Sequence, residues 1–212
     1  IDWLGNSFTA WVALIGLDVW QWTPFVTLIL IAGMSALPAE PLEAASVDGA
    51  NAWQIFRHIS FRLLAPFIGI ALVLVYAVGS GMLVNTRDGW FRGLNKASWQ
   101  PPDYVPGLIW PYSFVVLGIT AVLVSNRLST LAASIYLTIF ALSVAAALTW
   151  AYQFFGPHNL EAAAIALTVL SSLTIVMVII AARASVPVAI ALVVYQLWVI
   201  TATAVGWAFV RL

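Results

Sequence analysis

The sequence has no cysteine and very little charge. Only 8% of its 212 residues are charged, with 8 Lys and Arg against 8 Asp and Glu, so the formal net charge is zero. The absence of cysteine excludes disulfides, thiolate metal sites and thiol nucleophiles. Because the charges balance and no basic block occurs, nothing indicates binding to nucleic acid.

Catalytic motifs are also missing. The sequence contains no HExxH metal motif, no G-x-S-x-G nucleophile motif and no glycine-rich phosphate loop. Its only histidines, His58 and His158, lie in different segments. No pair of carboxylates lies within one apolar run, so a proton relay across a membrane is not indicated. We therefore expect no enzymatic activity, no metal site and no obligatory cofactor.

Apolar residues are abundant instead. They make up 63% of the chain, and the mean hydropathy is +1.02. A soluble domain carries about a quarter charged residues, so this composition predicts an integral membrane protein, with the lipid bilayer as its first partner. We expect the bacterial inner (cytoplasmic) membrane. The Lys and Arg residues fall four and four on alternating loops, so they do not predict an orientation. We also expect the sequence to begin inside a longer or processed chain, since Ile1 opens no standard signal peptide.

Five apolar runs are each long enough to cross a bilayer. A spanning helix needs roughly 20 mostly apolar residues. The predicted spans are 66–84, 105–124, 128–155, 160–182 and 186–210. Short breaks separate the last four, at 125–127, 156–159 and 183–185, and Asn159 is the predicted N-cap of the fourth. Short loops make successive helices antiparallel, so the sequence predicts an all-α five-helix bundle.

Composition changes near residue 64. The run 22–37 is apolar and predicts one extra membrane helix, whereas 38–62 is amphipathic and carries both signs of charge. We therefore predict two segments. Residues 1–64 form a membrane helix followed by an amphipathic helix–turn–helix, and residues 65–212 form the five-helix bundle.

Residues 18–67 carry a specific pattern, in which Glu43-Ala44-Ala45 is followed by Gly49 and then by Ile59. Through it, about residues 1–67 resemble the permease subunits of binding-protein-dependent ABC importers of the sugar-uptake kind. The resemblance implies that Glu43, Ala44, Ala45 and Gly49 form a coupling-type element that faces the cytoplasm and docks on an ATPase subunit. The residues themselves fit such an element, because Asp48-Gly49 favours a tight turn.

This segment also departs from the permease pattern. Arg62 stands where the family usually has proline, and only one complete predicted span precedes the motif. The remaining helices cannot line a translocation pathway of that kind. Two interpretations stay open: a working ATPase-docking loop, or a gene-fusion remnant retained as a membrane anchor, which the missing spans favour.

The loop 89–110, GWFRGLNKASWQPPDYVPGLIW, is dense in tryptophan and proline. Its pattern comprises Trp90-Phe91, Leu94, Lys96-Ala97, Trp99 and Pro101-Pro102, then Trp110 and Phe114. In this pattern, about residues 65–212 resemble the TspO/MBR family, the tryptophan-rich sensory proteins related to the mitochondrial translocator protein. Further along, Trp150 and Trp198 agree with that family's third and fifth helices.

The TspO/MBR resemblance implies a pocket between the helices that binds porphyrins and some sterol-like or drug-like ligands. The matched ligand-binding positions are Trp90, Phe91, Trp99, Pro101, Trp110, Phe114, Ala147, Trp150, Trp198 and Ala202. The residues support such a site, since Pro101-Pro102 stiffens the loop into a possible lid, and Arg92 and Lys96 add positive charge near its mouth. A porphyrin, a flat disc with carboxylates, suits this combination.

Several positions have lost the polar group usual in the family. Phe91 and Phe114 stand where tyrosine is common, and Ala147 stands where the family typically has asparagine. Ala97 and Val194 replace prolines. A pocket with fewer hydrogen-bonding groups still binds an apolar disc but discriminates less among ligands. Each tryptophan taken singly also fits the interfacial aromatic belt of a membrane protein.

Three functions therefore remain open. The first is a ligand-binding sensor or carrier for tetrapyrroles or similar lipophiles. The second is a partial permease that works with an ABC ATPase. The third is an accessory structural subunit of a larger membrane complex, one that holds pigments. A homodimer is compatible with each of them.

Overall fold

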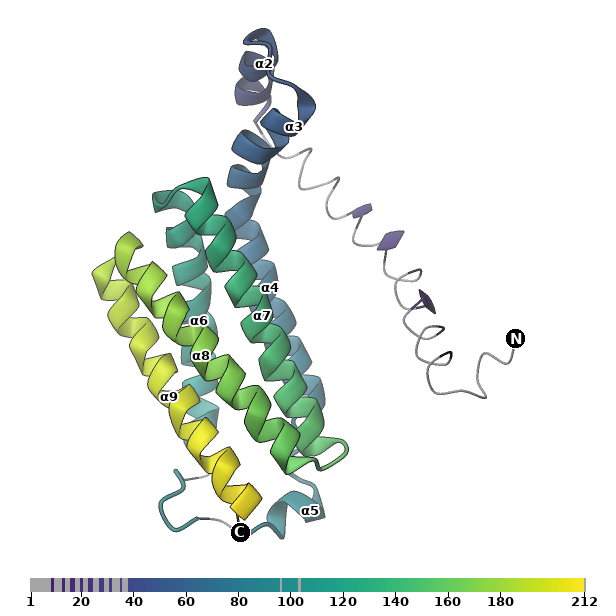
Figure 1. Cartoon of the computed structure of the whole chain (residues 1–212), viewed down its shortest axis with the longest axis vertical. Coiled ribbons are helices and arrows are strands. Elements are labelled where there is room, and N and C mark those ends of the chain that lie inside the picture. Colours follow the sequence, from purple (N-terminus) through teal and green to yellow (C-terminus); the bar gives the residue numbers. More distant parts are fainter. Residues whose placement is uncertain are drawn as a thin grey trace. The chain divides into compact units, whose positions relative to one another are not determined.

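The computed structural model describes residues 38–95, 97–102 and 104–211, together with isolated positions between 9 and 35. The extra membrane helix predicted at 22–37 lies largely outside these residues. Every regular element in the described ranges is helical. The chain divides into two compact units, Ile1–Leu64 and Ala65–Leu212 (Figure 1).

The described part of the first unit is a helical hairpin. Helix α2 (Ala39–Val47) leads through a turn to helix α3 (Ala52–Ile55), which continues into a π-helical turn, η1 (Phe56–Ser60). The predicted tight turn is confirmed, because Gly49 has a φ of 79°. Asn51 then starts α3 with a capping box: its side chain accepts the Gln54 N–H at 2.9 Å, and Gln54 Oε1 accepts the Asn51 N–H at 2.8 Å.

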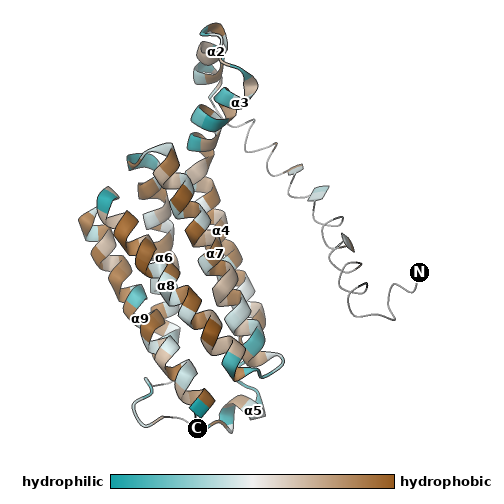
Figure 2. Ribbon diagram, viewed as in Figure 1, coloured by the Kyte–Doolittle hydropathy of each residue, from teal (hydrophilic) through white to brown (hydrophobic). Residues whose placement is uncertain are grey.

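The second unit is the predicted bundle. Its long helices are α4 (Phe61–Leu83), α6 (Val105–Arg127), α7 (Thr130–Phe155), α8 (Leu160–Ala184) and α9 (Val186–Arg211). A single-turn helix, α5 (Gly89–Arg92), lies in the loop between α4 and α6. The five long helices are each long and apolar enough to cross a membrane, and Figure 2 shows hydrophobic residues along their length. The protein is an integral membrane protein.

The helix ends agree with the break predicted at 156–159 and correct the other two, since α8 continues through Ala184, into the break predicted at 183–185. Asn159 caps α8 as predicted, since its side chain accepts the Ala162 N–H at 3.0 Å. The break predicted at 125–127 is wrong, because α6 continues through Arg127 and the chain becomes extended only at Leu128. The polar residues Ser125, Asn126 and Arg127 do not end α6, because the last turn of a helix tolerates polar side chains. Arg127 also donates from Nη1 to the Ala184 carbonyl at 3.2 Å, and so satisfies the C-terminus of α8.

Small residues let the helices approach closely. Gly69 of α4 packs directly on Ala121 of α6, and a side chain at Gly79 would meet Leu148 of α7. Large aromatic residues fill the centre, where the Tyr76 and Tyr195 hydroxyls lie 3.3 Å apart and join α4 to α9. Helix α8 packs against both α7 and α9, and α6 packs against α9. A cavity remains towards the end of the bundle where α5 lies.

Candidate functional site

The cavity has a volume of about 380 Å³ and lies within the second unit. The loop between α4 and α6 forms one side of it, through Phe91, Arg92, Gln100 and Pro101. Residues of α6, α7, α8 and α9 form the rest. Cavities of roughly 300–1,000 Å³ with mainly apolar walls are typical of small-molecule sites. The size and the walls therefore fit a small hydrophobic ligand.

Aromatic rings dominate the walls. Trp110 of α6 and Trp150 of α7 are nearly parallel, with ring centroids 6.5 Å apart and an angle of 18° between the planes. Phe154 lies one turn beyond Trp150 and contacts Phe91 of α5 and Phe209 of α9. The aromatic contacts thus connect the loop to the helices around the cavity. Flat, polarisable faces of this kind favour a flat conjugated ligand.

Few polar groups reach the cavity. Arg92 supplies a guanidinium, and no ion pair in the described ranges occupies it. The side-chain oxygen of Gln100, Oε1, is buried without a hydrogen-bond partner. The Thr201 hydroxyl already donates to the Leu197 carbonyl at 2.9 Å. A ligand would therefore meet the Arg92 guanidinium in a site whose described walls are mainly apolar.

The structure brings together six of the ten predicted ligand-binding residues. They line the cavity from the loop, α6, α7 and α9: Phe91, Pro101, Trp110, Trp150, Trp198 and Ala202. The loop with its short helix α5 and three long helices position these side chains, although they lie far apart in the sequence. Whether they bind a ligand stays a prediction.

The other four predicted residues do not line the cavity. Trp90 packs against Phe154 and stacks on His158 of the α7–α8 loop. Trp99 is 55% exposed. Phe114 lies behind Trp110, against the Tyr76 ring, and Ala147 is buried in α7. Of the two predicted cations, Arg92 lines the cavity, and Lys96 lies outside the described residues.

Sequence reasoning missed several cavity residues. Phe154, Gly206 and Phe209 follow predicted residues at helical spacing: Phe154 is four residues after Trp150, and Gly206 and Phe209 are four and seven after Ala202. That spacing places them on the same helix faces and is a usable signal. Leu167 and Leu170 of α8 carry no such signal, because an apolar side chain that faces a cavity looks the same in sequence as one that faces lipid.

Metal ligands are not gathered near the cavity or elsewhere in the described ranges. Within 38–95, 97–102 and 104–211, no three His, Asp or Glu side chains are placed to hold a metal ion.

The coupling-type residues lie in the first unit. Glu43, Ala44 and Ala45 are on α2, and Gly49 forms the turn that follows. Glu43 also borders a shallow groove between α2 and the α3–η1 segment, whose other side includes Ile55 and Phe56. The structure thus presents the motif on an exposed hairpin, and docking of an ATPase there stays a prediction.

Comparison with known proteins finds ABC permeases for the N-terminal third of the chain. It is 43% identical over 74 residues to the trehalose/maltose transport system permease protein MalF of Thermococcus litoralis, a match that covers 35% of this chain and 25% of the relative. It is also 43% identical over 74 residues to a probable ABC transporter permease protein of Brucella abortus, covering 35% and 26%. The osmoprotective compounds uptake permease protein GgtC of Synechocystis is 39% identical over 75 residues, covering 35% and 25%. The chain thus spans about a quarter of the length of these relatives, and both halves of the predicted fusion-like organisation have known counterparts.

The remaining two thirds match a different family. The family model of TspO/MBR matches residues 67–212, which include the whole cavity and all but the start of α4. Because this match covers more than half of the chain, the protein belongs to the TspO/MBR family.

Proposed function

We propose that the bundle binds a flat, apolar, anionic ligand of the tetrapyrrole class in the aromatic cavity, and that it acts as a sensor or carrier in the bacterial inner membrane. One observation carries the proposal. Six residues of the family pattern, drawn from the loop and from three long helices, converge on one cavity of about 380 Å³. An aromatic belt does not require such convergence, because belt residues need only share a depth in the membrane.

The charge at the cavity supports an anionic ligand. Arg92 is the cation among the described residues that line it, and no carboxylate among them lines it with Arg92. An apolar disc with an acidic group can place the disc between the tryptophans and the acid beside the guanidinium. A neutral lipid would form no ion pair with Arg92.

Phe91 supports broad rather than narrow recognition. It lines the cavity without a hydroxyl, at a position where tyrosine is common in the family. The polar groups that remain are few and lie mainly on the loop side. A site of this kind selects by shape, flatness and charge, and less by directed hydrogen bonds.

A titration of the detergent-purified chain with protoporphyrin, followed by tryptophan quenching, tests the proposal. We expect saturable quenching with micromolar or better affinity, lost in a Trp110→Ala, Trp198→Ala double variant. Trp53→Ala is the matched control, because Trp53 lies in the other unit and is 66% exposed. Linear quenching that is identical in the native chain, the double variant and Trp53→Ala would show that the cavity does not bind protoporphyrin. It would favour the function as a structural subunit.

A second candidate function rests on the first unit. The hairpin presents Glu43 beside a groove, and Trp53 and Phe56 stack with centroids 5.7 Å apart and are 66% and 40% exposed. An ATPase subunit that docks there would cover these rings. Copurification of an ATPase with the native chain, lost on Gly49→Val and kept on Gly81→Val, would support this function. Absence of any ATPase from the native complex would leave the hairpin as a membrane anchor.

A further inference from the structure

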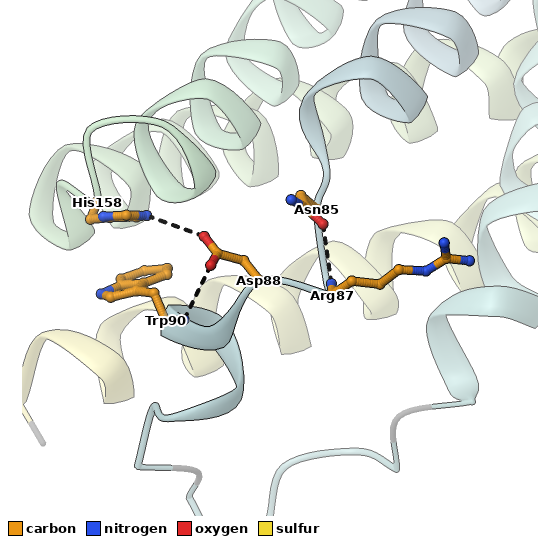
Figure 3. Close-up of polar contacts among 5 residues, drawn as sticks. All are labelled: Asn85, Arg87, Asp88, Trp90 and His158. Atoms are coloured by element: carbon orange, nitrogen blue, oxygen red, sulfur yellow. Dashed lines mark hydrogen bonds and ion pairs between the residues drawn. The ribbon is translucent and has the colours of Figure 1, made fainter.

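A compact cluster joins the α7–α8 loop to α5 beside the cavity (Figure 3). The His158 ring stacks on the Trp90 ring, with centroids 3.8 Å apart and 20° between the planes. His158 Nε2 lies 3.9 Å from Asp88 Oδ2. The other carboxylate oxygen of Asp88, Oδ1, accepts the backbone N–H of Trp90 at 3.3 Å and so caps the N-terminus of α5. One histidine therefore contacts both the cap and the first aromatic residue of this short helix.

The backbone holds the histidine in an unusual conformation. His158 has a φ of 58°, in the left-handed region, where histidine, asparagine and aspartate are enriched among residues other than glycine. The next residue, Asn159, donates its N–H to the Gln153 carbonyl at 2.8 Å and caps α8. The loop is thus tied to both α7 and α8, and His158 is placed by a fixed support. Strained residues of this kind cluster at functional sites.

The cluster is coupled to the cavity through α5. Trp90 contacts His158, and the next two residues, Phe91 and Arg92, line the cavity. Trp90 also packs edge-on against Phe154, another cavity residue, with centroids 5.4 Å apart. Because α5 has only one turn, a contact that fixes Trp90 also fixes its two neighbours.

We propose that His158 is a pH-dependent latch that holds α5 against the cavity when the imidazole is protonated. A protonated ring gains an ion pair with Asp88 and a cation–π contact with the face of Trp90. A neutral ring keeps only the stacking. Protonation is favoured as the pH falls, so the latch tightens towards acid pH and loosens towards alkaline pH. The side chains of His158 and Asp88 are 37% and 42% exposed, so protons reach them from water.

Other charged groups at this end of the bundle do not reverse the sign. Arg87 points away from the imidazole in Figure 3. Glu161 lies in the first turn of α8, and its charge would favour the protonated ring. Arg92 and Arg211 lie on α5 and in the last turn of α9, and in the described ranges neither forms an ion pair with Asp88 or Glu161. Among the described residues, Asp88 is therefore the ion-pair partner of the imidazole, and the charge of Glu161 acts in the same direction.

The absence of cysteine from the chain allows a direct test in the ligand-free protein. Ala202→Cys places one thiol in the cavity, and its rate of modification by a water-soluble methanethiosulfonate reports access. The rate is compared at each pH with that of the same thiol in a chain that also carries His158→Asn. Asparagine tolerates the left-handed backbone but cannot be protonated, and the ratio of the two rates cancels the ionisation of the thiol.

Near pH 5.5, we expect modification to be about fivefold slower in the chain that keeps His158 than in the His158→Asn chain, and near pH 8 we expect nearly equal rates. Asp88→Asn keeps the cap on α5, because asparagine caps as well as aspartate, and it should reduce the difference to about twofold. His58→Asn, in the other unit, is the control and should leave the pH dependence unchanged. A rate ratio that is constant with pH would overturn the latch, as would a fivefold difference that survives Asp88→Asn.

The latch rests on the proposed function only in its consequence, which is that the cavity retains its ligand at acid pH. The thiol test uses no ligand, so the two proposals fail separately. If protoporphyrin does not bind but the rate ratio changes with pH as expected, the latch stands and the ligand proposal falls. If protoporphyrin binds but the ratio stays constant, the latch alone falls.

Discussion

The two units of the chain use aromatic residues in opposite ways. In the hairpin of the first unit, Trp53 and Phe56 stack on each other and remain 66% and 40% exposed. In the bundle, Trp110, Trp150 and Trp198 are partly buried around one cavity. The difference follows from the number of elements available. Within the described residues of the first unit, only the hairpin itself is available to cover its rings, whereas five packed helices and a loop can enclose theirs.

The similarity to known proteins divides in the same way. The bundle matches a family model over 67–212, and the first unit matches about a quarter of the length of ABC permeases. The turn and the cap of the first unit depend only on neighbouring residues, Gly49 for the turn and Asn51 with Gln54 for the cap.

The largest expected effect concerns the packing that encloses the bundle's rings. Gly69→Leu should lower the free energy of unfolding by about 1–3 kcal/mol, because Gly69 packs directly on Ala121 and a side chain must displace α6. Gly81→Leu is the matched control, since the space around Gly81 is open. Thermal unfolding in detergent measures both. Equal melting temperatures for the two variants would show that close contact of α4 and α6 does not hold the bundle together.

A smaller effect is expected in the hairpin. Gly49→Val should cost about 1–2 kcal/mol locally, because the turn needs a φ of 79° that a β-branched residue avoids. We expect faster hydrogen exchange across 39–55 and an unchanged melting temperature of the bundle. If the bundle melted earlier as well, the two units would not be independent, and the contrast between them would have to be abandoned.

The smallest effect concerns the charge at the cavity. Arg92→Gln should weaken protoporphyrin binding about two- to fivefold, since the guanidinium is exposed to water as well as to the cavity. Binding of the dimethyl ester, which has no acid groups, should not change. Arg87→Gln serves as control, because Arg87 does not line the cavity. Equal losses for acid and ester would assign Arg92 a packing role and remove the argument for an anionic ligand.

Much of the bundle could be predicted because length and hydropathy alone decide which runs span a membrane. The error at 125–127 shows the limit of this reasoning. Polar residues predict the end of an apolar run, but a helix can continue through them, as α6 does to Arg127. Exact helix ends depend on local partners, such as the contact from Arg127 to the end of α8.

The site could be predicted only where a sequence pattern marked it. The loop motif and its matched positions include Trp110, Trp150 and Trp198, which line the cavity. Leu167 and Leu170 of α8 were not predicted, because sequence does not distinguish the inner from the lipid-facing side of an apolar helix. The contact of His158 with Asp88 and Trp90 was also unpredictable, since it joins two loops through a left-handed backbone.

The most direct test of the central claim is an experimental structure of the chain with protoporphyrin bound. The account predicts one porphyrin per chain in the cavity, in contact with Trp110, Trp150 and Trp198, and with an acid group beside Arg92. A porphyrin found only on the lipid-facing surface, with the cavity residues unmoved, would contradict it.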